Sequence, residues 1–310
     1  MLNKISESTL ELKKKTIMKL KNFSKEAKKL VSIARTADLK KTAIPFYDIL
    51  PSWCFPERHL RFKAYCVGMG KTGTSSLHVT FSNQYRSAHY AEDRFVINRI
   101  LAFSNGKINQ TEFTRYVKHR DRRLGLEMDS SPLNYHLIDI LVSEFSEAKF
   151  IFTLRDCYSW LDSFINHSLT YPQIYNTWFR HHNVKLEELH FRSNKFKHAK
   201  EEQVLADNGL YTLEGYFSYW KEHNSKVLAT VPPERLLVVK TSQINQNINR
   251  IETFLGIMPG SLPTQVRVNV GKKKFNLLSK IDKRFLEEKA EAHCKELMDE
   301  YFSDVKGFNF

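Results

Sequence analysis

The sequence predicts an α/β domain built on a mostly parallel sheet with helices on both faces. The chain has 310 residues, of which 42% are hydrophobic, and this is enough for one sizeable core. Short apolar runs alternate with stretches whose apolar residues recur at helical spacing. A glycine-rich turn, Gly68–Gly70, stands between the first run and a helical stretch. This alternation favours parallel strands joined by crossover helices.

The elements follow in order along the chain. Residues 1–60 are expected to form a basic helical extension, with Pro45 and Pro51 marking irregular chain, and residues 61–310 a single domain. Strands are predicted at 62–67, 124–128, 149–154 and 236–239. Helical patterns follow the glycine-rich turn and the third strand, and recur at 137–145, 213–228, 248–255 and 283–302.

The charge of the chain narrows the class of ligand. The formal net charge is +14, and the first 41 residues hold 12 Lys or Arg against 4 Asp or Glu. The simplest interpretation of that segment is a solvated helix face. The basic excess elsewhere fits a polyanionic nucleotide. No nucleic-acid-binding module is recognisable, so we expect no nucleic-acid partner.

Cysteine spacing and hydropathy bear on the compartment. The four cysteines, Cys54, Cys66, Cys157 and Cys294, show neither CxxC spacing nor a zinc-site pattern, so no metal is expected. The simplest interpretation is that these cysteines are free thiols in a reducing compartment. No apolar run approaches the length of a membrane span, and no signal-peptide core is visible. We therefore expect a cytoplasmic protein without a transmembrane segment, and the sequence leaves its oligomeric state open.

The turn after the first strand carries the first chemical signal. Gly68–Leu77 reads GMGKTGTSSL. Glycines permit a tight turn whose N–H groups point at one spot, and the following helix adds its positive end, so the loop suits a phosphate. A Walker A loop places its lysine directly after the second glycine of GxxxxGK[ST]. Here Thr74 stands there, and the lysine is Lys71, inside the loop.

The segment from Lys71 to Leu77 resembles the 5′-phosphosulfate-binding loop of sulfotransferases that use 3′-phosphoadenosine 5′-phosphosulfate (PAPS). That resemblance implies a P-loop-like sulfotransferase fold over about residues 60–275. It also implies a 5′-phosphate cradle and a lysine that neutralises the sulfuryl and leaving-group oxygens. The lysine is Lys71, and the cradle is Thr72, Gly73, Thr74, Ser75 and Ser76.

A second segment matches the same family. Residues 149–163, KFIFTLRDCYSWLDS, deliver Arg155 from an apolar strand and Ser163 eight residues later. In the family this Arg and Ser bind the 3′-phosphate of PAPS, a task that suits the planar guanidinium. The family often has proline where this chain has Cys157. Residues 234–244 and 254–257 also resemble the family's late strand and helix end.

A basic segment near the C-terminus also resembles a part of this family. Residues 268–274, VNVGKKK, occupy the place of the family's basic loop near the 3′-phosphate, although their order differs from the better-known R-K-G. The resemblance adds Gly271, Lys272 and Lys273 to the expected PAPS-binding residues. A solvated loop is the alternative interpretation of these lysines.

Sulfuryl transfer also needs a group that takes the acceptor's proton. Asp129 is the first candidate, because relatives place a catalytic His or carboxylate after the corresponding strand. The alternative is that Asp129 caps a helix or orders a turn. His89 is the second candidate, with a surface or packing histidine as its alternative. Glu127 and His136 are weaker candidates.

Three functional hypotheses follow. The first is PAPS-dependent sulfuryl transfer to a hydroxyl or amine of a small-molecule or sugar acceptor. The second is a P-loop kinase for a small molecule, which the displaced lysine disfavours. The third is a non-catalytic nucleotide-binding protein on a sulfotransferase scaffold. The joint presence of Lys71, Arg155 and Ser163 disfavours it. The sequence does not identify the acceptor.

Overall fold

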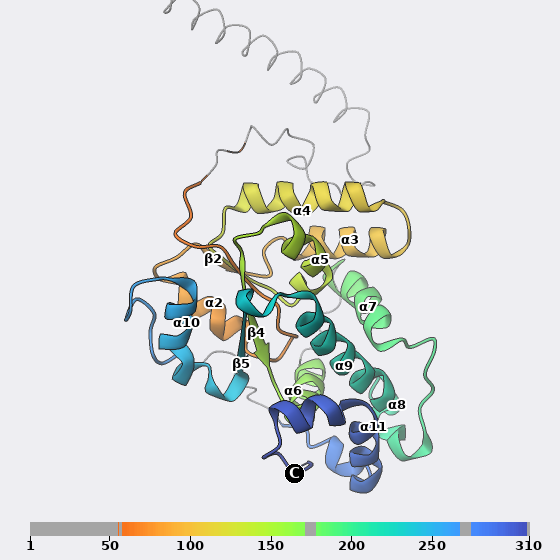
Figure 1. Ribbon diagram of the computed structural model, residues 1–310. Coiled ribbons are helices and arrows are strands. Elements are labelled where there is room, and N and C mark those ends of the chain that lie inside the picture. The colour runs from red at the N-terminus through yellow and green to blue at the C-terminus, as the bar shows by residue number, and fades with distance from the viewer. Residues whose placement is uncertain (1–54, 56–57, 171–177, 267–273, 309–310) are drawn as a thin grey trace, which may run out of the picture. The chain divides into compact units, whose positions relative to one another are not determined.

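The central sheet that the described residues form has five strands, all parallel, in the order β2-β3-β1-β4-β5 (Figure 1). The computed structural model describes Phe55 and residues 58–170, 178–266 and 274–308. The strands are β1 (Ala64–Cys66), β2 (Ser87–His89), β3 (Met128–Ser130), β4 (Lys149–Leu154) and β5 (Leu236–Lys240). The predicted extension over residues 1–60 lies almost entirely outside the described part of the chain.

Helices cover both faces of the sheet, as predicted. The helices are α2 (Thr74–Ser82), α3 (Asp93–Ser104), α4 (Gln110–Leu124), α5 (Asn134–Glu144), α6 (Cys157–Thr170), α7 (Trp178–Phe191), α8 (Gln203–Asp207), α9 (Leu213–Thr230), α10 (Ile248–Leu255) and α11 (Lys283–Tyr301). No helix in the described ranges combines the length and hydropathy that a membrane span needs.

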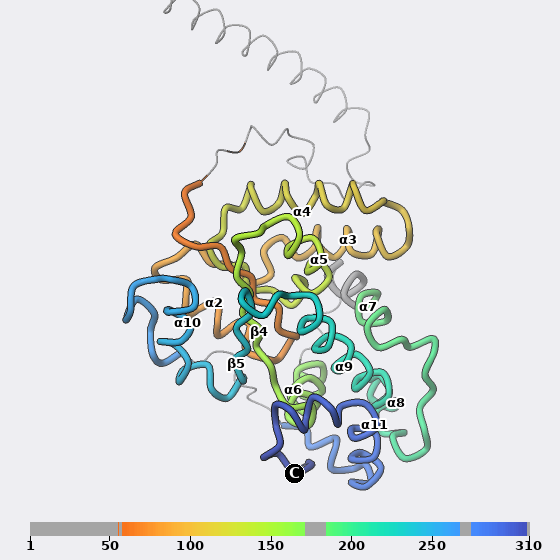
Figure 2. Tube along the Cα trace, viewed as in Figure 1, coloured from red at the N-terminus to blue at the C-terminus, as the bar shows by residue number. Residues whose placement is uncertain are grey.

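Two hydrophobic clusters divide the helices between the faces of the sheet. The first lies under α2 and α10, where Leu77, Phe81 and Ile251 pack on alternate residues of the strands. The second contains Tyr65 and Phe150 from the strands, together with buried residues of α3, α4, α5, α6, α9 and α11. Figures 1 and 2 show α2 beside α10, apart from the other helices. Successive strand residues therefore point into different clusters.

The predicted ranges hold for β4 and β5, whereas β1 spans only Ala64–Cys66 of the predicted range 62–67. Strand β4 begins and ends as predicted, and β5 extends one residue beyond its predicted range. The predicted strand at 124–128 is wrong. Helix α4 continues to Leu124, and Gly125 ends it in the left-handed conformation, φ 53°. The strand can begin only after this turn, and it spans Met128–Ser130.

Helices α3 and α4 form a hairpin that the sequence analysis did not predict (Figure 2). Phe103 of α3 stacks on Phe113 of α4, with ring centroids 4.7 Å apart. Helix α4 begins with a capping box in which the side chain of Asn109 accepts from the N–H of Glu112 and the Glu112 carboxylate accepts from the N–H of Asn109. The hairpin covers the sheet face that Tyr65 occupies.

The strand order places the glycine-rich turn at the carboxyl end of the central strand. Strand β1 is central, with β3 on one side and β4 on the other, and the chain crosses from β3 to β4 past it. The turn follows β1 directly and leads into α2. In parallel α/β sheets, ligands bind beyond the carboxyl ends of the strands where the order reverses. The fold therefore places residues 68–74 where such sheets form binding sites.

Candidate active site

The loop after β1 approaches its neighbours too closely for larger residues at two positions. A Cβ atom on Gly68 would lie 1.9 Å from the Thr153 hydroxyl. Gly73 has φ 96°, and a Cβ there would lie 2.5 Å from Ile244. Lys71 itself has φ 71°, which is unusual for a residue with a side chain. Such backbone strain is found most often at ligand-binding sites.

Buried polar groups from three other elements hold this loop. The Thr72 hydroxyl donates to the Met69 carbonyl at 2.7 Å and lies 2.8 Å from the hydroxyl of Thr153 in β4. Trp160 of α6 donates its indole N–H to the Gly70 carbonyl at 3.0 Å. After β5, the Thr241 hydroxyl donates to the Thr72 carbonyl at 2.8 Å. The loop is thus fixed before any ligand arrives.

Two cations, Lys71 and Arg155, lie at the loop, and the carboxylates of Asp156 and Asp162 offset part of the charge of Arg155. Arg155, directly after β4, donates from Nη1 to the Lys71 carbonyl at 3.1 Å and from Nε to the Ser159 hydroxyl at 2.9 Å. Burial and then the charge of Arg155 lower the pKa of Lys71. Burial also lowers the pKa of Arg155. No described residue forms an ion pair with Lys71, so an anionic ligand would relieve the repulsion between the two charges.

The donors at the start of α2 complete an anion-binding arrangement. No side chain caps this helix, and its first turn contains no acidic residue. Its first N–H groups therefore keep their hydrogen-bonding capacity, and the helix dipole is positive there. Together with Lys71 and Arg155, these donors fit a ligand that carries phosphate or sulfate groups.

His89 lies beside this loop, at the end of β2. Its Nε2 atom is 3.1 Å from Thr74 Oγ1 and 3.3 Å from Ser75 Oγ. The ring stacks on His78 of α2 and packs edge-on against Tyr90. Burial and then the charge of His78 lower the pKa of His89 to about 4. The imidazole is therefore neutral near pH 7 and can accept a proton.

Asp129 points to the opposite face of the sheet from His89. Asp129 pairs in register with Ala88 and Tyr65, whereas His89 pairs with Ser130. Since side chains alternate along a strand, His89 faces α2 and Asp129 faces α4. Asp129 is 3% exposed and accepts from Arg120 Nη1 at 2.7 Å. No hydrogen bond in the described part of the chain joins its carboxylate to the loop.

The comparisons with known proteins bear on this arrangement. The family model for the sulfotransferase domain matches residues 63–264. The chain belongs to the sulfotransferase domain family. No curated protein matches it by sequence. Among solved structures, it is similar to a sulfotransferase from Alicyclobacillus acidocaldarius, at 14% identity and a TM-score of 0.42, over 79% of this chain and 99% of that one.

A second similar structure is the sulfotransferase domain of the Synechococcus PCC 7002 olefin synthase. It shares 13% identity, has a TM-score of 0.35, and covers 76% of this chain and 90% of its own. The family match spans the loop, Arg155 and both candidate bases, so these residues lie within the sulfotransferase domain. Membership makes sulfuryl transfer the supported class of reaction.

The other predicted site residues lie in several parts of the fold. Ser163 is half-buried on α6, two turns after Arg155, and no described hydrogen bond joins the two. Gly271, Lys272 and Lys273 lie outside the described residues. The segment after them returns to α6, because the Phe275 N–H donates to the side-chain oxygen of Asn166 at 2.8 Å.

Neither weaker candidate base contacts the loop through a described hydrogen bond. Burial alone would raise the pKa of Glu127, but hydrogen bonds from Arg61 and the Arg86 N–H lower it to about 2. His136 lies on α5, with its Nε2 atom 2.7 Å from that of His190 on α7. Burial lowers the pKa of His136 to about 3.

Sequence reasoning missed the residues that support the sulfotransferase site from behind. Thr153, Trp160 and Thr241 are three of these supporting residues, and helix α9 contributes two more. Trp220 donates its indole N–H to the Arg155 carbonyl at 3.1 Å, and His223 Nε2 lies 2.9 Å from the Val67 carbonyl. In the sequence these residues are ordinary members of an amphipathic helix. Only their contacts with the ends of β1 and β4 distinguish them.

Proposed function

We propose that this protein transfers a sulfuryl group from PAPS to a hydroxyl or amine of a small-molecule or sugar acceptor. The observation that carries the proposal is the loop Gly68–Ser76, with its uncapped helix start and the two cations Lys71 and Arg155. Membership of the sulfotransferase domain family supports the same class of reaction. The displaced lysine still disfavours the kinase alternative.

The chain's own residues would share the work of binding. The N–H groups and hydroxyls from Thr72 to Ser76 suit the 5′-phosphate, and Lys71 suits the oxygens of the sulfuryl group. Arg155, with Ser163 and the 271–273 segment, would hold the 3′-phosphate. When bound, PAPS supplies the activated sulfuryl group, whose bond to the 5′-phosphate breaks as a bond to the acceptor forms. The protein mainly orients the reactants and neutralises charge.

We propose His89 rather than Asp129 as the group that receives the acceptor's proton. His89 lies within hydrogen-bonding distance of the hydroxyls of Thr74 and Ser75, and it is neutral near pH 7. Its lowered pKa makes it a weak base in the ligand-free protein. A bound anion beside it would raise that pKa and strengthen it as a base. Asp129 is buried against Arg120 on the other face of the sheet.

Nucleotide selectivity tests the donor. We expect calorimetric titration to show tighter binding of 3′-phosphoadenosine 5′-phosphate (PAP), the desulfated product, than of ATP with Mg²⁺. Lys71→Ala should weaken PAP binding, because it removes a cation that faces the anionic oxygens. A phosphate-binding loop alone does not distinguish PAP from ATP. Equal or tighter binding of ATP with Mg²⁺ would therefore overturn PAPS as the proposed donor.

Transfer itself requires an acceptor. A screen of phenols, aliphatic alcohols, amines and sugars with labelled PAPS would identify one, and single-turnover rates would then follow. We expect His89→Gln to lower the rate about 100-fold or more, as loss of a general base does, with PAP affinity nearly unchanged. PAP binding without transfer to any acceptor would favour the non-catalytic alternative. The cytoplasmic location and the 60/61 domain boundary stay predictions.

A further inference from the structure

The short segment that joins β2 to α3, His89–Glu92, has a constrained backbone. Tyr90 has φ 55° and Glu92 has φ 58°, both in the left-handed region. Residues with side chains adopt this conformation rarely, and it persists where surrounding contacts enforce it. Two such residues among the three that follow His89 mean that the direction of its imidazole depends on what holds this segment.

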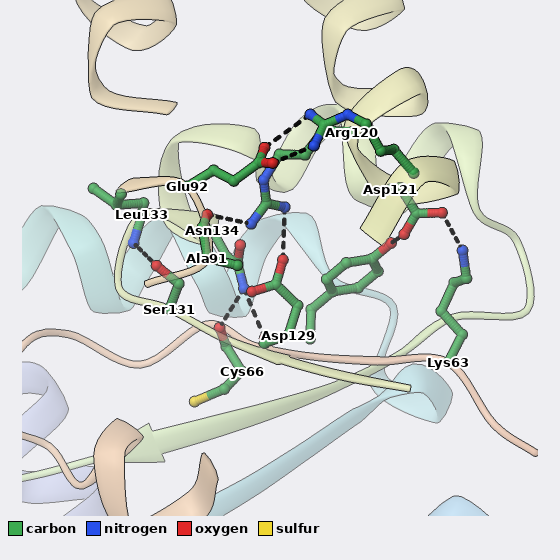
Figure 3. A network of polar contacts seen from close by, with 12 residues as sticks. Lys63, Cys66, Ala91, Glu92, Arg120, Asp121, Asp129, Ser131, Leu133 and Asn134 are labelled. Carbon is green, nitrogen blue, oxygen red and sulfur yellow. Dashed lines mark hydrogen bonds and ion pairs between the residues drawn. The ribbon is translucent and has the colours of Figure 1, made fainter. Parts of the chain in front are cut away.

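Helix α4 provides the contacts that enforce this conformation (Figure 3). Arg120 donates from Nη2 to the Ala91 carbonyl at 2.9 Å. One turn later, Arg123 forms a two-point ion pair with the Glu92 carboxylate, in which Nη2 and Oε2 are 2.8 Å apart. The two arginines thus bind the only two residues between Tyr90 and the start of α3. They act on the backbone that carries His89, not on His89 itself.

Asp129 fixes Arg120 in turn. The Arg120–Asp129 ion pair, 2.7 Å from Nη1 to Oδ2, leaves only 4% of each side chain exposed. A buried pair of this kind often contributes little net stability, because both charges lose their hydration. In some proteins such a pair instead specifies one geometry among several. Here it aims the second nitrogen of the guanidinium at the Ala91 carbonyl, as Figure 3 shows.

We propose that Arg120, aimed by Asp129, is a positioning residue that sets His89 against the loop hydroxyls by fixing the 89–92 segment. The inference rests on the proposed role of His89 in proton transfer. It also gives a function to the buried carboxylate of Asp129, which lies on the face of the sheet opposite His89. Asp129 would then affect catalysis without touching a reactant.

The decisive variant is Arg120→Lys. Lysine keeps the positive charge beside Asp129, but its single nitrogen lacks the rigid fork that reaches Asp129 and Ala91 together. We expect His89 to leave its desolvated position, and its pKa, followed by NMR titration of the imidazole, to rise from about 4 toward 6.5. Once an acceptor is known, kcat should fall about 100-fold, as misplacement of a reacting group does, with acceptor KM and PAP affinity nearly unchanged.

The matched control is Asp121→Asn on the same helix. Asp121 is a largely buried carboxylate that accepts from the Tyr65 hydroxyl at 2.6 Å and pairs with Lys63, and no described contact joins it to residues 89–92. It should lower stability without moving the titration of His89. If Arg120→Lys leaves both the His89 pKa and kcat at wild-type values, the inference is wrong.

A second variant covers the case in which Arg120→Lys does not fold. The double variant Arg120→Met/Asp129→Asn removes both buried charges together, which proteins tolerate better than an unpaired charge. It should fold and still release His89. A folded double variant with a wild-type His89 titration would overturn the inference. Because the titration needs no acceptor, it judges the positioning role even if sulfuryl transfer itself is not found.

Discussion

At the scale of single residues, Arg155 combines a structural contact with a proposed ligand contact. Nη1 and Nε are engaged by the Lys71 carbonyl and the Ser159 hydroxyl, while Nη2 has no partner in the described ranges of the chain. We therefore expect Arg155→Ala to weaken PAP binding about 10- to 100-fold, since a charge-assisted hydrogen bond contributes about 1.5–3 kcal/mol. Adenosine 5′-phosphate, which lacks the 3′-phosphate, should lose about threefold or less. Calorimetry with both nucleotides measures the difference.

The two tasks of Arg155 can be separated by a control. Ser159→Ala removes the hydroxyl that orients the guanidinium but leaves its charge in place, so PAP affinity should change little. Equal losses for both nucleotides in Arg155→Ala would mean that the residue supports the Lys71 carbonyl and does not read the 3′-phosphate. PAPS would remain the proposed donor after that result, because its choice depends on the affinity for PAP compared with that for ATP.

At the scale of elements, Arg235 ties the end of α5 to the sheet. Its guanidinium donates to three carbonyls, those of Val142 at 3.1 Å, Phe145 at 2.6 Å and Ala148 at 2.8 Å. Cations suit the negative end of a helix, where the last carbonyls have no intrahelical partner. Val142 lies in the last turn of α5, Phe145 is its C-cap, and Ala148 precedes β4. We expect Arg235→Ala to lower the free energy of unfolding by about 2–3 kcal/mol.

Urea denaturation followed by circular dichroism measures the effect of Arg235→Ala. The control is Arg284→Ala, which removes an exposed ion pair with Glu288 one turn along α11 and should leave stability near wild type. Equal stability of the two variants would mean that Arg235 does not stabilise this end of α5 through the carbonyls that it contacts.

The success of sequence prediction also differed by element. Strand β4 has four apolar residues among six and α10 has a clear hydrophobic stripe, and both elements have their predicted bounds. Helix α4 was not predicted, because its sequence is mostly polar and its buried face is narrow. That face includes the charged residue Arg120. Strand β2 has three small or polar residues, too few to show an alternating pattern.

The same limit explains the two candidate bases. The loop Gly68–Leu77 and Arg155 could be recognised from local sequence, because each motif lies within one strand-to-helix turn. Choosing between His89 and Asp129 requires the register of β2 against β3, since a shift of one residue exchanges the faces. Three-residue strands do not reveal their register in sequence. The network through Arg120 could not be predicted, because it joins three separate elements.

At the scale of the whole molecule, buried and half-buried histidines make stability depend on pH. Burial lowers the pKa of His89 to about 4, of His136 to about 3 and of His223 to about 3. In the unfolded chain these groups take up protons below about pH 6.5. Their contribution to stability is therefore complete above pH 6.5 and is lost as the pH falls toward 4 and 3.

One carboxyl opposes this trend. Burial raises the pKa of Glu187 to about 7, so the folded state binds its proton more tightly and gains stability from it as the pH falls from 7 to 4.5. The effect of Glu187 alone does not cancel the effects of the three histidines. We therefore expect the urea concentration at the unfolding midpoint to decrease as the pH is lowered from 6.5 to 4. His223→Gln should flatten this slope. A midpoint constant from pH 6.5 to 4 would mean that the buried histidines gain protons without opening the fold. The neutral state assigned to His89 would then lose its physical basis.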